Sequence, residues 1–286
     1  MNFLENVFIK DKESLSKKIN QIKKDGVNKL HIVSDFDKTL NKEFLKTGKY
    51  KSVISLIRDG GYLENDYPKR AYDLYDKYHF YENDLNISFI ERKEKMRDWW
   101  QEHIKLLSEC KMNKEVINDI LSKETLELRE GVDSFLKICF ENKIPLLIFS
   151  SGVGDIITGF LTKNNLFFPN THIISNFFDW DENGFAKPYY KGNKTIHMFN
   201  KDETEIKNTI YFLEIKNRDN VIVMGDSLED IKMISGLEHK NIISIGFLNS
   251  DIENKLETYK NIFDIVIVND GSFMQVLDIL NEIIKD

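Results

Sequence analysis

The sequence is poor in cysteine, which excludes two common ways of stabilising a fold. Cys110 and Cys139 are the only cysteines among 286 residues. They are too few and too widely spaced for a disulfide framework or a structural zinc site. We therefore expect a protein of a reducing compartment, the cytoplasm.

Long apolar runs and an excess of positive charge are also missing. No stretch is long enough to span a membrane, and residues 1–10 have neither the basic lead nor the apolar length of a signal peptide. The net charge of −7 argues against a nucleic-acid partner. We find no internal repeat and no low-complexity linker. The remaining composition, 41% hydrophobic and 30% charged, is typical of a globular protein with one large or two modest domains.

Two aspartates follow the first apolar β-branched run. Ile32 and Val33 indicate the end of a buried strand, and Asp35 and Asp37 come directly after it. In an open α/β sheet, ligands bind at this carboxyl edge. Alternation along extended chain points both carboxylates to one side, where they need a cation or a shared proton. An acidic turn with no further role is the alternative, and Asp35 and Asp37 by themselves do not decide between the two.

A second acidic strand end lies nearly two hundred residues later. Gly225 and Asp226 close the apolar run that begins at Val221, and Asp230 follows four residues on. If a helix starts at Ser227, Asp226 and Asp230 can both face a metal ion. Simple helix capping is the alternative. Two acidic strand ends in one chain favour a Mg²⁺ site.

Two further segments supply groups that suit an anion. Ser150, Ser151 and Gly152 form a small-residue exit from the strand at Leu146–Phe149 into a helix, where hydroxyls and free N–H groups hold an anion. Lys201 is a cation upstream of the Val221 strand. Each has an ordinary structural alternative, N-capping for the serines and a solvated surface position for the lysine.

The order of predicted elements indicates an α/β fold, a Rossmann-like three-layer parallel sheet with an inserted helical cap domain. A charged amphipathic helix precedes the first strand, and Asn183-Gly184 predicts a hairpin tip within 179–184. After Gly131, strands are predicted at Leu146–Phe149, His172–Asn176, Val221–Met224, Ile242–Ile245 and Ile265–Val268. Between 42 and 128 the three- and four-residue apolar spacing predicts helices at Tyr67–Glu82, Ser88–Leu107 and Lys114–Lys123. We predict core domain residues 1–41 and 129–286, and cap residues 42–128.

Taken in order, these motifs resemble those of the haloacid dehalogenase-like phosphohydrolases. One branch is much more similar, the cytosolic 5′-nucleotidase III (pyrimidine 5′-nucleotidase) family, and the resemblance runs from about residue 10 to the C-terminus. The strings that carry it are Ser34–Leu40, Phe149–Asp155, Ser175–Gly184, His197–Lys201 and Gly225–Ser227. The resemblance implies a monomeric, Mg²⁺-dependent enzyme of nucleotide metabolism that hydrolyses nucleoside 5′-monophosphates.

The resemblance implies a role for each site residue. Asp35 is the nucleophile, and Asp37 is the acid and base. Mg²⁺ is held by Asp35, the Asp37 carbonyl and Asp226, with Asp230 behind them or acting through water. The phosphate is bound by Ser150, Ser151 and Lys201, while the Thr39 hydroxyl fixes the turn around Asp35.

The cap is expected to select the base. Lys77–Asp84 resembles the family segment in which a glutamate, here Glu82, binds the base edge, and Trp99 lies on the following aromatic helix. His103 stands where a base-contacting serine is expected. Pyrimidine nucleotides (CMP, UMP) are the first expected substrates, and 7-methylguanosine 5′-monophosphate is the alternative. A phosphatase of other specificity, such as a phosphoserine type, and an inactive phosphate-binding protein remain the less favoured interpretations.

Overall fold

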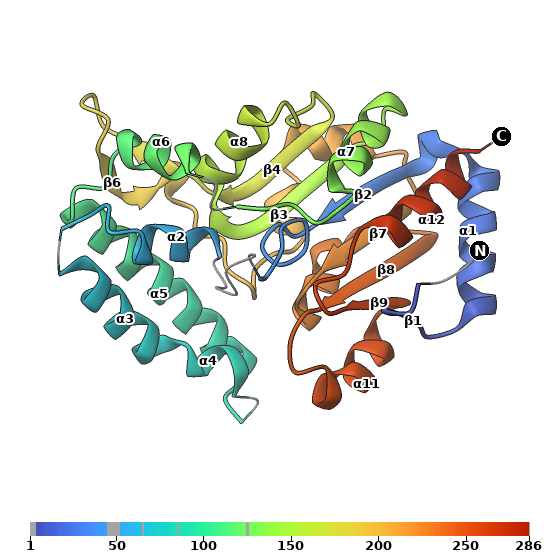
Figure 1. Cartoon of the computed structure of the whole chain (residues 1–286), viewed down its shortest axis with the longest axis horizontal. Coiled ribbons are helices and arrows are strands. Elements are labelled where there is room, and N and C mark those ends of the chain that lie inside the picture. Colours follow the sequence, from blue (N-terminus) through green and yellow to red (C-terminus); the bar gives the residue numbers. More distant parts are fainter. Residues whose placement is uncertain (1–3, 45–51, 65, 85, 124–125, 286) are drawn as a thin grey trace.

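The computed structural model describes residues 4–44, 52–64, 66–84, 86–123 and 126–285 (Figure 1). Within them a seven-stranded sheet forms the centre of the molecule. In spatial order its strands are β1 (Val7–Ile9), β9 (Ile265–Val268), β8 (Asn241–Leu248), β7 (Asn220–Gly225), β2 (Leu30–Ser34), β3 (Leu146–Val153) and β4 (Thr171–Asn176). All neighbours are parallel except β1, which pairs antiparallel with β9. The predicted α/β fold class is confirmed, whereas the short edge strand β1 was not predicted.

The central strands are apolar on both faces, and successive residues enter two different cores. Ile32 joins a large cluster on one face, and its neighbour Val33 joins a second cluster on the other. This follows from the two-residue period of extended chain. Both residues are fully buried. The strands therefore form a rigid platform whose carboxyl ends hold the residues discussed below.

Helices cover both faces of the sheet, which makes a three-layer core. The face with Ile32 packs against α1 (Lys12–Asp25), α7 (Val132–Glu141), α8 (Gly154–Lys163) and α12 (Met274–Ile284). The face with Val33 packs against α9 (Glu203–Ile206), α10 (Ile210–Ile215) and the 3-10 helix η3 (Leu228–Ile234). α11 (Ile252–Ile262) packs on β8 and β9, and the 3-10 turn η1 (Val27–Lys29) precedes β2.

A helical segment is inserted between β2 and β3, and most of it lies to one side of the sheet (Figure 1). It consists of α2 (Val53–Asp59), α3 (Tyr67–Tyr78), α4 (Phe80–Asn83), α5 (Phe89–Glu109) and α6 (Lys114–Ser122). A hairpin of β5 (Phe178–Trp180) and β6 (Ala186–Tyr190), followed by the 3-10 turn η2 (Lys191–Asn193), reaches from the core to pack on α5. α6 packs on α8 of the core.

The chain crosses between the core and the helical segment at two places that lie side by side. Asn41 forms an antiparallel bridge with Leu128. The Lys42 N–H donates to the Glu127 carbonyl at 2.8 Å, and the Arg129 N–H donates to the Leu40 carbonyl at 3.0 Å. This paired crossing supports our proposal that residues 42–128 form a cap on a core made of 1–41 and 129–286.

Three local details differ from the sequence prediction. The helix expected over Tyr67–Glu82 is divided at His79, whose ring stacks on Tyr75 at 4.6 Å and bonds its carbonyl. α2 was not predicted. β3 continues to Val153 before α8 begins at Gly154, so the two serines lie on the strand and neither caps the helix.

Candidate active site

Three carboxylates from two strand ends gather at the centre of the sheet. Asp35 follows β2, Asp226 follows β7, and Asp230 lies in η3. One oxygen of each lies within 4.8 Å of the others. Since β2 and β7 are neighbours in a parallel sheet, their carboxyl ends meet at the same edge, where the strand order reverses direction. The Asp35 N–H donates to the Met224 carbonyl at 2.9 Å, which holds the two strand ends together.

Lys201 joins this group from a distant loop. Its Nζ donates to Asp35 Oδ1 at 2.6 Å and to Asp230 Oδ1 at 3.0 Å, and all three side chains are buried. Although burial lowers the pKa of Lys201, Asp230 and Asp35 raise it above its usual value. Lys201 is therefore a permanent cation beside both carboxylates.

Two asparagines fix the loop that carries Lys201. The Asn176 side chain donates to the Ile196 carbonyl at 2.8 Å and accepts from the Ile196 N–H at 2.7 Å. Asn200 Oδ1 accepts from the His197 N–H at 2.7 Å. Because Asn176 ends β4, the loop is fastened to the same edge of the sheet as the acidic strand ends.

Asp230 approaches the end of β7 closely because Gly225 has no side chain. A Cβ on Gly225 would lie 2.2 Å from the Asp230 Cβ. Asp230 Oδ2 accepts from the Ser227 N–H at 3.0 Å, and Ser227 Oγ accepts from the Glu229 N–H at 3.2 Å. The capping geometry expected at Ser227 is present on a 3-10 helix, and it aims one Asp230 oxygen at the backbone and the other at Lys201.

The charges at this centre suit a divalent cation. Burial raises the pKa of Asp35 well above its usual value, against the effect of Lys201, and neighbouring Asp230 and Asp226 raise it further. Burial, followed by the charge of Asp230, raises the pKa of Asp226 to about 7. Two buried carboxylates and the half-buried Asp226 share one lysine, which leaves excess negative charge when they are ionised, and hard oxygen ligands are those that Mg²⁺ prefers. The residues present therefore fit the ion.

Asp37 lies apart from the three clustered carboxylates. Its Oδ1 accepts from the Val53 N–H, at the start of α2, at 3.0 Å and from Asn41 Nδ2 at 3.4 Å. Burial raises its pKa to about 6, although these donors and Lys38 oppose the shift. A carboxyl group with this pKa can give and take protons near neutrality.

The end of β3 lies against Asp37. A Cβ on Gly152 would be 3.3 Å from Asp37 Oδ2. Ser150 Oγ accepts from the Gly152 N–H at 3.0 Å, and the Ser151 carbonyl accepts from Asn176 Nδ2 at 2.7 Å. The structure thus brings Ser150, Ser151, Asp35, Asp37 and Lys201 to one edge of the sheet.

Within the residues that the structure describes, Thr39 Oγ1 is buried without a hydrogen-bond partner, so its hydroxyl does not fix the turn as expected. Arg129 holds this turn. It is 1% exposed, donates to the Thr39 carbonyl at 2.8 Å, to the Lys38 carbonyl and to Asn249 Oδ1 at 2.9 Å, and pairs with Asp270 at 3.0 Å. No local pattern singled out Arg129 in the sequence, because all of these partners are distant along the chain.

In the helical segment, Glu82 lies on α4 and is largely enclosed. Burial raises its pKa, while Lys38, next to Asp37, and His79 lower it. The carboxylate of Glu82 therefore lies within electrostatic reach of the core loop that follows β2. Trp99 is half-buried on α5, with its ring edge-on to Tyr75 at 5.9 Å.

His103 lies inside the helical segment. It is 5% exposed, and its Nε2 shares a 3.0 Å hydrogen bond with the Tyr67 hydroxyl. Burial, followed by the charge of Arg58, lowers its pKa to about 4, so the ring is neutral. A base that reached His103 would meet a side chain already bonded within the segment.

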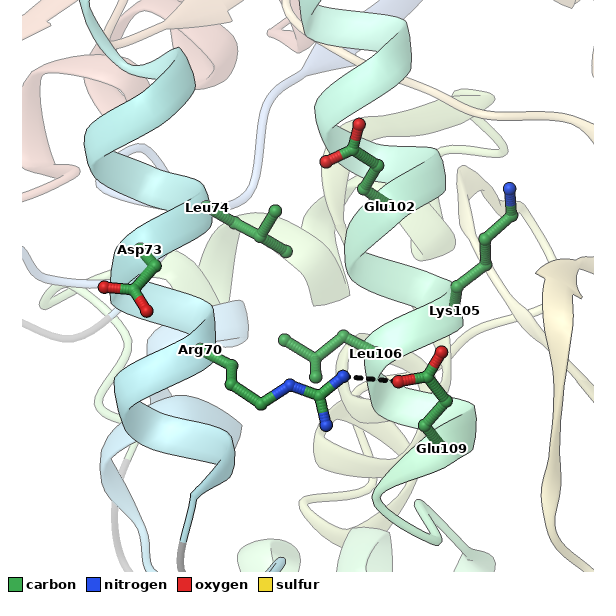
Figure 2. A pocket seen from close by; sticks show the side chains of 7 residues that line it. All are labelled: Arg70, Asp73, Leu74, Glu102, Lys105, Leu106 and Glu109. Carbon is green, nitrogen blue, oxygen red and sulfur yellow. Dashed lines mark hydrogen bonds and ion pairs between the residues drawn. The ribbon is translucent and has the colours of Figure 1, made fainter.

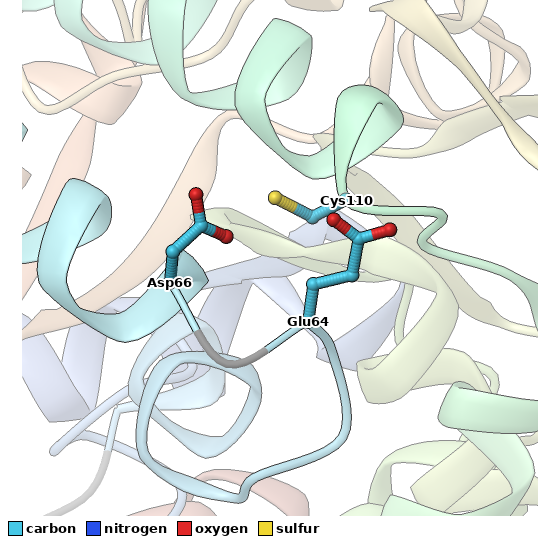
Figure 3. Close-up of side chains that lie close together, drawn as sticks. All are labelled: Glu64, Asp66 and Cys110. Atoms are coloured by element: carbon cyan, nitrogen blue, oxygen red, sulfur yellow. The ribbon is translucent and has the colours of Figure 1, made fainter.

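Two other groups of polar residues lie in the helical segment, and we do not assign a catalytic role to either. A 360 Å³ pocket between α3 and α5 is lined by alternating charges over Leu74 and Leu106, with Arg70 paired to Glu109 (Figure 2). Glu64, Asp66 and Cys110 converge nearby (Figure 3). The Arg70 guanidinium already supplies positive charge there, because it lies 3.7 Å from Asp66 and donates to the Cys110 sulfur at 3.8 Å.

No helix in the described part of the chain has the length and apolar character needed to cross a membrane.

Comparison with known proteins identifies relatives along nearly the whole chain. The pyrimidine 5′-nucleotidase (UMPH-1) family matches residues 38–284. The 7-methylguanosine phosphate-specific 5′-nucleotidase A of Xenopus laevis is 34% identical over 280 residues, which cover 98% of this chain and 94% of that protein.

Solved structures agree with this result. Cytosolic 5′-nucleotidase IIIB bound to cytidine is 30% identical, with a TM-score of 0.87 over 98% of this chain and 94% of that one. A phospho-aspartyl intermediate analogue of phosphoserine phosphatase has a TM-score of 0.54 at 16% identity, over 87% of this chain and 97% of that one. At that identity the second likeness concerns the fold alone, and the fold is that of haloacid dehalogenase-like phosphatases.

Proposed function

Because this chain belongs to the pyrimidine 5′-nucleotidase (UMPH-1) family and is a hydrolase of the 5′-nucleotidase type, we propose that it hydrolyses nucleoside 5′-monophosphates through an aspartyl-phosphate on Asp35. The observation that carries this proposal is the contact of Lys201 with Asp35 and Asp230, beside Asp226. In this arrangement Lys201 orients one oxygen of the buried Asp35 and provides positive charge near the proposed phosphate position.

The reaction has two steps. Asp35 attacks phosphorus in line and forms the acyl-phosphate bond as the bond to the nucleoside 5′-oxygen breaks. Asp37, protonated at Oδ, gives its proton to the leaving 5′-oxygen. A water molecule then attacks phosphorus as Asp37 takes its proton, and the acyl-phosphate bond breaks, which releases phosphate and regenerates Asp35. Ser150, the Ser151 N–H group and Lys201 stabilise the charge on the equatorial oxygens.

Mg²⁺ is the proposed cofactor. Asp35, the Asp37 carbonyl and Asp226 would hold it, with Asp230 oriented behind them by Ser227 and Lys201. When bound, the ion neutralises the charge of the carboxylates and of the substrate phosphate, so that one anion can attack another. Because burial and neighbouring carboxylates raise the pKa values of Asp35 and Asp226, a bound cation would offset the cost of ionising them.

The proposed cap, residues 42–128, would select the base. Glu82 would accept hydrogen bonds from the base edge, and Trp99 would stack on its face, with His103 contributing through the aromatic packing behind Trp100. Two substrates are supported by separate observations. The cytidine-bound neighbour favours pyrimidine nucleotides. The name of the Xenopus relative favours 7-methylguanosine 5′-monophosphate, and this support is equally strong. A cytosolic location is part of the proposal, since the solved neighbour is named as cytosolic. A monomeric state is proposed from the family resemblance.

A substrate panel tests the proposal. Phosphate release is measured for CMP, UMP, 7-methyl-GMP, GMP, AMP and phosphoserine, each with Mg²⁺ and with excess chelator. We expect CMP and 7-methyl-GMP to lead and the chelator to abolish turnover. Preference for phosphoserine would overturn the nucleotide assignment, full activity in chelator would overturn the metal site, and no turnover of any substrate would indicate a binding protein.

A further inference from the structure

The loop that carries Lys201 is held by the helical segment on both sides of the lysine. Phe199, two residues before it, is 5% exposed and packs in one cluster with Tyr78 of α3 and Met96 of α5. Asp202, directly after it, lies 3.9 Å from Lys93 Nζ on α5. The placement of Lys201 on the nucleophile therefore depends on contacts with a different part of the molecule.

Arg92 of α5 joins this loop to the helix that bears Glu82. Its guanidinium lies 4.6 Å above the centre of the Phe199 ring. Its Nε donates to the Tyr81 carbonyl at 2.9 Å, and its Nη2 donates to the Glu82 carbonyl at 2.5 Å. Arg92 is 8% exposed. A guanidinium in this position costs desolvation energy, which these hydrogen bonds and the aromatic face offset.

The loop end of this connection is also fixed. The Phe199 N–H donates to His197 Nδ1 at 3.3 Å. Burial lowers the pKa of His197 to about 4, so its Nδ1 remains free to accept. The Phe199 backbone is thus held two residues before Lys201, and Lys201 in turn contacts Asp35 at 2.6 Å.

We propose that Arg92 and Phe199 are positioning residues that couple base recognition at Glu82 to the placement of Lys201 at the nucleophile. The inference rests on the proposed function, because it takes Glu82 as the base contact. A base bound at Glu82 restrains α4, whose Tyr81 and Glu82 carbonyls accept hydrogen bonds from Arg92. Arg92 in turn packs on Phe199 of the loop that carries Lys201. Binding energy from the base then raises kcat as well as lowering KM.

The test compares two substrates with the same leaving group. Ribose 5-phosphate has the primary 5′-oxygen of a nucleotide and lacks the base. The quantity measured is the ratio of kcat for the better of CMP and 7-methyl-GMP to kcat for ribose 5-phosphate. We expect Arg92→Met to lower this ratio about tenfold, the scale of a desolvated cation–π contact. Arg92→Lys, which keeps a cation over the ring, should recover part of it.

Phe199→Leu provides an independent variant, since leucine keeps apolar burial and removes the aromatic face. It should lower the same ratio, and the double variant with Arg92→Met should fall no further than either single one, because both remove one contact. Arg70→Met is the matched control. It removes ion pairs to Glu109 and Asp66, both within the helical segment and outside the cluster that contains Phe199. Its ratio should equal that of the parent.

The outcomes separate the two proposals. A parent enzyme that turns over ribose 5-phosphate as fast as any nucleotide overturns both the proposed function and the coupling. A parent that prefers the nucleotide, with a ratio unchanged by Arg92→Met and Phe199→Leu, overturns the coupling alone. Equal losses for both substrates, together with a lower melting temperature, would show a purely structural role and also overturn it.

Discussion

At the scale of single residues, the two aspartates that follow β2 have different surroundings. Asp35 contacts a permanent cation, which keeps one oxygen oriented. Asp37 has backbone and amide donors and a pKa of about 6, raised by burial. Two carboxyl groups on one short segment therefore have different partners, a lysine for Asp35 and backbone and amide donors for Asp37.

Replacement of Asp37 by asparagine should slow CMP hydrolysis by about 10²–10⁴-fold, the usual contribution of a general acid. The loss should be much smaller for p-nitrophenyl phosphate, because p-nitrophenolate leaves without a proton. At saturating Mg²⁺, kcat/KM of the parent for CMP should fall as pH rises above about 6, when Asp37 loses its proton. Steady-state kinetics with both substrates provide the measurement.

Asp155→Asn is the control for that variant. Asp155 is also an enclosed carboxyl group with a pKa raised by burial, and it accepts from the Phe178 N–H at 2.9 Å, away from the reacting groups. It should lower stability and leave the ratio of the two substrates unchanged. Equal losses of CMP and p-nitrophenyl phosphate turnover in Asp37→Asn would remove Asp37 as the acid.

Glu82 should set the order of CMP and UMP. An ionised carboxylate only accepts, so it suits the 4-amino group of CMP and repels the 4-carbonyl of UMP. In Glu82→Gln the amide can donate to UMP, and the ratio of CMP to UMP kcat/KM should fall about tenfold. The ratio in the parent should also fall in acid, where the raised pKa of Glu82 lets the protonated form donate.

Glu102→Gln serves as the control, because Glu102 pairs with Lys77 and accepts from the Tyr78 hydroxyl within the helical segment. Its CMP to UMP ratio should match that of the parent. If Glu82→Gln leaves the ratio unchanged, Glu82 does not contact the base.

At the scale of elements, the end of β7 and the start of η3 form one unit. Gly225→Ala would drive a methyl group against the Asp230 Cβ, 2.2 Å away, and push η3 from the strand. We expect the Mg²⁺ concentration for half-maximal activity to rise at least about tenfold, because Asp230 and Asp226 then lose their spacing. A Mg²⁺ titration of initial rates measures this.

The neighbouring strand offers a matched variant. Gly246 of β8 lies directly opposite Gly225 in the sheet, and a Cβ there would meet the Phe263 ring at 2.5 Å. Gly246→Ala should lower the melting temperature by overpacking and leave the Mg²⁺ requirement as in the parent. An equal Mg²⁺ requirement in both variants would show that Gly225 acts on stability alone.

At the scale of the whole molecule, Mg²⁺ should stabilise the fold in a pH-dependent way. Burial raises the pKa values of Asp37 and Asp226 from 3.8 to about 6 and about 7. Their protonated forms favour the folded state, and this contribution is lost as pH rises through those values. The proposed Mg²⁺ ligands include the ionised carboxylates of Asp35 and Asp226, so the stabilising effect of Mg²⁺ should grow as pH rises through about 7.

We expect saturating Mg²⁺ to raise the melting temperature by about 5–10 °C at pH 8, the shift for a ligand at a hundred times its Kd. The shift should be near zero at pH 5. Differential scanning calorimetry with Mg²⁺ and with chelator gives the difference between the two melting temperatures at each pH. The titration of the buried histidines contributes equally to both temperatures and therefore cancels. Asp226→Asn should reduce the shift at pH 8. A shift that is independent of pH would contradict a carboxylate metal site.

The sequence by itself determined the α/β fold, the carboxyl ends of β2 and β7 and the acidic positions Asp35, Asp37 and Asp226. It did so because short apolar β-branched runs and the small or acidic residues that follow them are local properties, and parallel strands bring their carboxyl ends to one edge. The four-residue spacing between Asp226 and Asp230 also predicted that these two carboxylates lie close together.

Only the tertiary structure decided which distant groups meet at that edge. Lys201 reaches Asp35 across 166 positions of the chain, and Arg129 holds the turn that Thr39 was expected to fix. His103 lies at a position expected to contact the nucleotide base, yet its ring shares a hydrogen bond with the Tyr67 hydroxyl. No periodicity encodes such partners, because a buried charge or hydroxyl is satisfied by whichever group the packing of separate elements brings within about 3 Å.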